Sequence, residues 1–190
     1  MIINCTVEMR YYDNASTWTI NVSVVDIDGE VGRNDTITFT YNPLSAMSFA
    51  VAWINFSSMT LGGSDQAAAN PLILNNTGND DFDQINITAA ALIGVDISAQ
   101  TIAAAQFAVN YTNENVPAGS GLPLSNSPQV IPGVDSTANL TLMHGHSSAS
   151  DIVISAKGNQ SLWFWVDVPS SGLSAQKYNN TWNITVIDLP

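Results

Sequence analysis

Two histidines separated by one glycine are the residues of this chain best suited to binding a transition metal. His144 and His146 are its only histidines, and two imidazoles joined by a carboxylate would make a metal site. They also follow directly on a strand expected at residues 140–143, where a polar turn is the simpler interpretation. We expect the turn and no metal site.

Two acidic loops have some of the oxygen ligands that calcium needs. Residues 26–30 (DIDGE) alternate acidic side chains, but an EF-hand would need an acid where Ile37 stands and would place its glycine two positions later than Gly29. Residues 79–83 (NDDFD) form a second acidic group. Because aspartates are common in turns, we expect β-turns without metal in both loops.

Catalytic patterns are weak in this sequence. It contains no Gly-x-Ser-x-Gly elbow, and its histidine pair has no nucleophile specified beside it. A glycosidase-type pair of carboxylates depends on the fold, so the 16 acidic residues leave that alternative open. We expect no catalytic site and no enzyme activity.

Asparagine carries the strongest chemical pattern in the chain. Twelve of the 20 asparagines begin an Asn-x-Ser/Thr sequon, whereas chance would give only about 4 at this content of Ser and Thr. Sequons accept N-linked glycans on exported proteins, although a strand-rich sequence also makes such triplets by alternation. The predicted glycosylation sites are Asn4, Asn14, Asn21, Asn34, Asn55, Asn75, Asn86, Asn110, Asn139, Asn159, Asn179 and Asn183.

Composition narrows the classes of partner. With 4 Lys+Arg and a net charge of −12, the chain has no basic surface for nucleic acid or anionic lipid. No apolar run is long enough to span a bilayer, so we expect no membrane insertion by this chain. Cys5 is the single cysteine, which excludes an intrachain disulfide. We expect no cofactor, only N-linked glycans.

Alternating apolar and polar residues predict strands along most of the chain. The clearest are residues 162–168 and 182–187, which flank a turn-rich loop and are expected to close a β-sandwich. Residues 98–108 allow at most a short helix, and residues 117–133, rich in Pro and Gly, are expected to form a long surface loop. Further strands are predicted at residues 3–9, 17–25, 36–41, 71–75, 85–89, 107–111, 138–142 and 152–155.

This spacing of strands and turns favours an all-β fold, an immunoglobulin-like β-sandwich. Residues 44–190 form the sandwich, and residues 1–43 form an N-terminal β segment, either part of another immunoglobulin-like unit or an arm between subunits. The sequons support the strands, because Asn and Ser/Thr of a sequon share one face of a strand while the middle residue points to the other. The mostly large and apolar middle residues are Cys5, Val22, Phe56, Ile87, Tyr111, Leu140 and Ile184.

The pattern of residues 70–190 resembles that of archaeal glycosylated cell-surface proteins. An NNTGN turn precedes an INIT strand at residues 75–88, and DVP at residues 167–169 is followed by TWNITV at residues 181–186. The resemblance implies immunoglobulin-like domains of the cell envelope and an extracellular or cell-surface location. Some related small β-sandwich proteins polymerise into pilus-like extracellular filaments.

The function we expect is structural. Three amphipathic strands within residues 1–43 are too few to bury their own apolar faces, so we expect them to contact a second copy in a homopolymer, a filament or an envelope layer. The alternative for this segment is that it folds back into a single larger sandwich. The alternative function is a carbohydrate-binding or adhesion module that stacks surface glycans on Trp163 and Trp165, unless their strand is buried on both faces.

Glycans are expected on most of the 12 sequons of the native protein. Mass spectrometry of the intact protein before and after chemical deglycosylation measures this directly. A native mass equal to the 20.2 kDa of the polypeptide would remove the main argument for export.

Overall fold

The computed structural model describes residues 4, 6–10, 13, 15–79, 84–113, 121–135 and 159–187. All strand pairs in these ranges are antiparallel, and the only helical segment there is the short 3-10 turn η1 (Ala104–Gln106). The all-β prediction is therefore confirmed. No described helix is long and apolar enough to cross a membrane.

The strands are β1 (Ser16–Val25), β2 (Val31–Tyr41), β3 (Met47–Phe49), β4 (Gln66–Ala67), β5 (Leu72–Asn76), β6 (Gln84–Ala89), β7 (Leu92–Gly94), β8 (Thr101–Ile102), β9 (Phe107–Asn110), β10 (Leu122–Pro123), β11 (Gln129–Asp135), β12 (Asn159–Val166), β13 (Tyr178–Asn179) and β14 (Trp182–Ile187).

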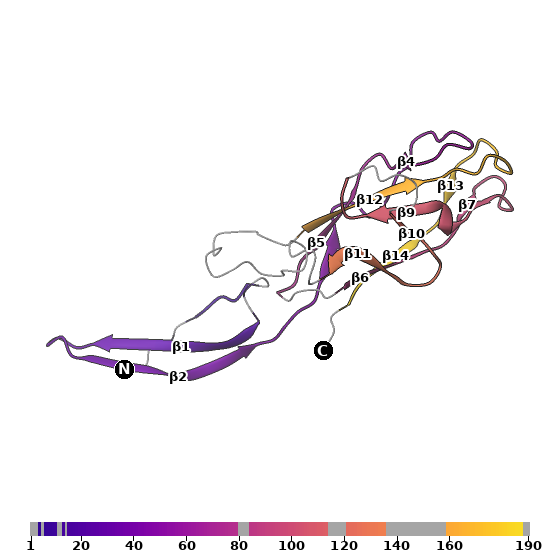
Figure 1. The fold of residues 1–190 in the computed structure, drawn as a ribbon. Coiled ribbons are helices and arrows are strands. Elements are labelled where there is room, and N and C mark those ends of the chain that lie inside the picture. Colours follow the sequence, from indigo (N-terminus) through magenta and orange to yellow (C-terminus); the bar gives the residue numbers. More distant parts are fainter. Residues whose placement is uncertain are drawn as a thin grey trace.

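Two sheets of unequal size form the body of the molecule (Figure 1). The larger has the order β10-β9-β12-β5-β3 with β4 also paired to β12, and the smaller has the order β11-β6-β14. A third, very short sheet, β13-β7-β8, lies at the end of the body far from the N-terminal strands. The two strands predicted to close the sandwich lie in opposite sheets, and they meet where the rings of Phe164 and Trp182 lie 6.0 Å apart.

Apolar side chains from both sheets form one core, as a β-sandwich requires. Leu74 of β5, Ile85 of β6 and Ile131 of β11 have no exposed surface. Phe107 of β9 meets the ring of Trp182 edge-on, with centroids 5.1 Å apart. Every buried core residue in the described ranges falls between Leu72 and Val168, so residues before β5 contribute none of them.

β1 and β2 form a separate hairpin that projects from one end of the sandwich (Figure 1). Trp18 lies opposite Phe39 and Ile20 opposite Ile37, so these side chains share a face, while pairs of threonines occupy the other. We call the first the apolar face of the hairpin. It consists of Trp18, Ile20, Val22, Val24, Ile37, Phe39 and Tyr41.

Some predicted elements differ from those observed. Residues 6–9 form no strand, so that part of the strand predicted at residues 3–9 is wrong. The predicted loop at residues 117–133 contains β10 and most of β11. Because β11 lies at the edge of its sheet, it can include Pro132, whose backbone nitrogen cannot donate a hydrogen bond to a neighbouring strand. The strands predicted at residues 138–142 and 152–155 lie outside the described residues.

Deletion of residues 1–42 is expected to leave the sandwich folded, because the core begins at Leu72. By contrast, Leu74→Ala should lower the free energy of unfolding by about 2–5 kcal/mol, because it opens a cavity in that core. Chemical denaturation followed by circular dichroism compares the two variants. A truncated chain without a cooperative transition would contradict the division of the chain near residue 43.

Candidate functional site

The sequon asparagines that the structure describes are exposed or half-buried. Of those in the described ranges, Asn75, Asn86 and Asn110 are half-buried, and the Oδ1 atom of Asn86 is buried without a hydrogen-bond partner there. Asn14 and Asn139 lie outside the described residues. The exposed ones are Asn4, Asn21, Asn34, Asn55, Asn159, Asn179 and Asn183.

The middle residues of the sequons are covered only where a second sheet lies over them. Ile87 is 1% exposed in the sandwich, whereas Val22 on the hairpin is 43% exposed. The half-buried Phe56, Tyr111 and Ile184 pack against the core. The predicted buried face is therefore confirmed for the sandwich, whereas on the hairpin Val22 is exposed in the single chain and its burial stays a prediction. Cys5 and Leu140 lie outside the described residues.

The acidic loop at the tip of the hairpin forms a turn. One carboxylate oxygen of Asp26 accepts hydrogen bonds from the backbone N–H groups of Asp28 and Glu30, both at 2.9 Å. Gly29 adopts a positive φ of 86°, which favours glycine. The carboxylate of Asp26 thus stabilises its own turn, as an aspartate in a turn commonly does.

The remaining acidic residues and histidines of the candidate metal patterns are not among those that the structure describes. Asp80, Asp81, Asp83, His144 and His146 lie outside the described residues. Within the described ranges, no three His, Cys, Asp or Glu side chains are close enough to share an ion.

Asn79, considered above as a calcium ligand, instead joins the sandwich to the base of the hairpin. Its side-chain oxygen accepts a hydrogen bond of 2.6 Å from the backbone N–H of Leu44, and its amide nitrogen donates one of 3.3 Å to the carbonyl of Asn42. Its own backbone N–H donates to the Leu44 carbonyl at 3.0 Å. Gly78 lies so close to the same carbonyl that any side chain would collide with it. We call Gly78 and Asn79 the linker clamp.

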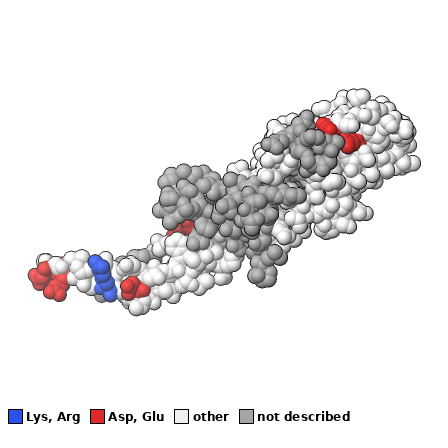
Figure 2. Space-filling view, viewed as in Figure 1, with Lys and Arg blue, Asp and Glu red and all other residues white. Residues whose placement is uncertain are grey.

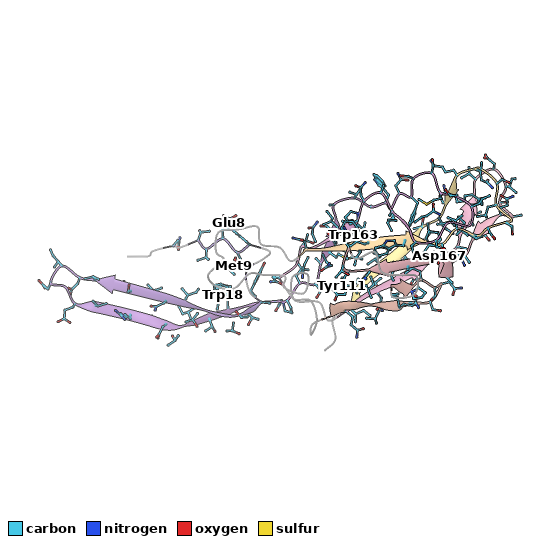
Figure 3. All side chains as sticks on the ribbon, turned by 45° about the horizontal axis from the view of Figure 1, so that its top comes forward. Glu8, Met9, Trp18, Tyr111, Trp163 and Asp167 are labelled. Carbon is cyan, nitrogen blue, oxygen red and sulfur yellow. The ribbon has the colours of Figure 1, made fainter. Side chains whose placement is uncertain are left out.

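The two tryptophans proposed to stack on sugars do not form an exposed platform. Trp165 is only 7% exposed, and Trp163, two residues earlier on the same face of β12, is half-buried (Figure 3). Asp167, which follows the strand, accepts a hydrogen bond of 2.8 Å from the backbone N–H of Asp65. The interpretation of β12 as a strand covered on both faces is thus confirmed for Trp165.

The apolar face of the hairpin is largely open to solvent. Trp18 is 37% exposed, Ile20 36% and Val24 54%. Among the described residues, the preceding segment meets the hairpin at its base, where the Tyr41 hydroxyl donates a hydrogen bond of 3.2 Å to the Arg10 carbonyl. Within the described residues, β1 and β2 pair only with each other and belong to neither sheet of the sandwich.

A large apolar cavity lies in the sandwich beside β14, and the sequence pattern gave no indication of it. Its volume is about 970 Å³, and its walls include core residues such as Leu72 and Phe107. Trp53, which is 60% exposed, lies in the same wall. Lys177 is the only charged residue among those that line it. We call this space the β14 cavity.

The linker clamp leads to a prediction about Asn79. Asn79→Ala removes the partners of Leu44 and Asn42, and should lower the free energy of unfolding by about 1–3 kcal/mol because those backbone groups lose their hydrogen bonds. Hydrogen exchange at the Leu44 amide should become faster. Asn42→Ala is the control, because the exposed Asn42 enters the clamp only through its carbonyl. Unchanged exchange at Leu44 in Asn79→Ala would show that the clamp does not hold the linker.

The chain was also compared with known proteins. No protein-family model matches it, and no curated protein matches it. Its function must therefore be inferred from the hairpin, the linker clamp and the β14 cavity themselves.

Proposed function

We propose that this chain is a structural subunit of a glycosylated extracellular polymer, a filament or an envelope layer, and that its N-terminal hairpin makes the contact between copies. The observation that carries this proposal is the open apolar face of the hairpin. In the described structure, that face has no second layer beyond the few residues at its base.

Free energy favours a partner for this face. A two-stranded hairpin alone is marginally stable in water. Fully burying a side chain of the size of Val, Ile or Phe stabilises by roughly 1.5–3 kcal/mol. Ile20, Val24 and Ile37 are 36%, 54% and 50% exposed, so covering them would contribute favourably to the free energy of association. Contact with another copy would bury them and stabilise the hairpin at the same time.

The shape of the chain favours an open polymer. The hairpin extends from one end of the sandwich (Figure 1), and its partner surface on another copy would be a different surface. Such head-to-tail contacts do not close on themselves unless the rotation between copies brings the ends together. Among the described strands, β1 and β2 pair only with each other, so each presents an outer edge that suits addition to the sheet of a neighbour.

The remaining features agree with a surface location. Exposed sequons on the hairpin and on both sheets provide glycosylation sites, and the pattern of strands and turns resembles the immunoglobulin-like domains of archaeal cell-surface proteins. The alternative, carbohydrate binding by Trp163 and Trp165, has less support, because the ring of Trp165 is buried.

A charge on the apolar face should prevent assembly. Ile20→Asp places a carboxylate in the proposed contact and should keep the protein monomeric, whereas Thr19→Asp introduces the same charge on the opposite face and should leave assembly intact. Light scattering and negative-stain electron microscopy measure the outcome. Polymers of Ile20→Asp indistinguishable from those of the unchanged chain would contradict the proposal, as would a chain that never associates.

A further inference from the structure

We infer that the β14 cavity is the acceptor for the hairpin of a second copy, whose strands extend the smaller sheet at β14. This inference rests on the proposed function, because it identifies the surface that the hairpin meets. Four features of the described structure support it. They are the unequal sizes of the two sheets, the lower burial of side chains on β14 than on β6, the residues that line the cavity, and the positions of hairpin and cavity toward opposite ends of the molecule.

The smaller sheet is too narrow to cover the larger one. Three strands, β11, β6 and β14, face a sheet of six, and in the described chain β14 pairs with β6 alone. The β14 cavity lies beside this free edge, with core residues of the larger sheet in its walls. A hairpin added to β14 would supply two more strands where the cover is missing.

The burial of side chains decreases from β6 to β14. Ile85, Ile87 and Ala89 of β6 are at most 1% exposed, whereas Trp182 and Ile184 of β14 are half-buried, although they pack against the same core. A strand in the middle of a sheet has neighbours on both sides, and an edge strand has one. The core therefore remains open on the side of β14, where apolar side chains would be favourable.

The hairpin has the chemistry that this position needs. Added to β14, its apolar face would point into the cavity and its threonine face would point to solvent, which continues the alternation of a sandwich sheet. The contact belongs to the part of the apolar face around Ile20 and Ile37, beyond the residues at the base that the preceding segment contacts. Nearer the tip, the sequon residue Asn34 lies opposite Val22 on the same face, so a glycan there would shield the outer part.

Charge does not oppose this contact. The tip of the hairpin is acidic, with Asp26, Asp28 and Glu30 (Figure 2), and the chain as a whole carries a net charge of −12. The lining of the β14 cavity nevertheless includes no acidic residue and one basic residue, Lys177. An acidic hairpin thus meets no like charge there, although repulsion is expected over much of the remaining surface.

Donor and acceptor lie toward opposite ends of one molecule. Figure 1 shows the hairpin at one end and strand β13 at the other, and β13 residues Tyr178 and Asn179 line the β14 cavity. Each copy can therefore occupy the cavity of one neighbour while a third copy occupies its own. The product is a linear polymer with one free hairpin and one free cavity at its ends.

Mixing two defective variants tests this arrangement. Ile20→Asp removes the donor and keeps the cavity, and Trp53→Asp places a charge in the wall of the cavity and keeps the donor. Both residues are exposed and lie outside the buried core, so both variants should fold. Val130→Asp is the matched control for Trp53→Asp, because Val130 is an exposed residue of β11, at the edge of the smaller sheet opposite to β14.

The full-length chains are produced without glycosylation, because Asn55, Asn179 and Asn183 lie around the cavity.

At the lowest concentration at which the unchanged chain and Val130→Asp polymerise, each defective variant alone should remain monomeric, with association at least tenfold weaker. Their equimolar mixture should form a complex of two chains that grows no further, measured by light scattering after size-exclusion chromatography. Polymers of Trp53→Asp with monomers of Ile20→Asp would overturn the assigned acceptor while keeping the hairpin as donor. Polymers of both variants would overturn the proposed function as well, and a mixture that stays monomeric would overturn the assigned pairing.

Discussion

Apolar side chains on a two-stranded sheet have no second layer of their own to pack against, and this constraint explains most features of the molecule. In the sandwich, side chains from two sheets cover one another until residues such as Leu74 and Ile85 lose all exposure. The hairpin repeats the same alternation of side chains, but its apolar face remains open because the described chain places no sheet over it. The β14 cavity is the converse case, because the described chain places no further strand beside β14 there.

The linker clamp fixes the path of the chain between the hairpin and the sandwich within one copy. Asn79 uses its side chain and its backbone N–H to bind residues 42–44, and Gly78 permits the close approach. A buried amide with several hydrogen bonds stabilises one path of the backbone over others, because each alternative would leave polar groups unpaired. The hairpin is therefore directed away from the cavity of its own chain, and under the proposed function its face is buried against another copy.

Local alternation was enough to predict most strands, because one covered face gives a strand its period of two. Residues 182–187 and 85–89 were found in this way, close to the observed β14 and β6. The same alternation at residues 6–9 failed, because a pattern shows that a strand is favourable without showing that a partner is present. For the same reason the sequence could not place β12 and β14 in opposite sheets: which strands pair is decided by contacts between distant segments.

Of the two parts of the candidate site, only the apolar face of the hairpin could be predicted from the sequence. The exposed apolar face of the hairpin followed from residues 17–41, since too few strands accompany it, but the β14 cavity is formed by residues from before β4 to β14 and has no local pattern. Asn79 was considered as a calcium ligand because Asn and Asp are common both in metal loops and in turns. Only the observed bonds to Leu44 and Asn42 distinguish these roles.

The low fraction of charged residues in the chain gives its glycans a physical role in the proposed assembly. Only 11% of the residues are charged, compared with about 25% in typical soluble domains, and much of the visible surface is uncharged (Figure 2). The net charge of −12 gives a general repulsion between copies, but it does not select one exposed apolar patch over another. Glycans on exposed residues such as Asn21 and Asn159 would shield their surroundings, while the base of the hairpin's apolar face, around Trp18 and Ile37, contains no sequon. Under the proposed function, glycans on the hairpin would thus leave the part of its apolar face around Ile37 open, while those at Asn55, Asn179 and Asn183 around the β14 cavity would have to leave room for the incoming hairpin.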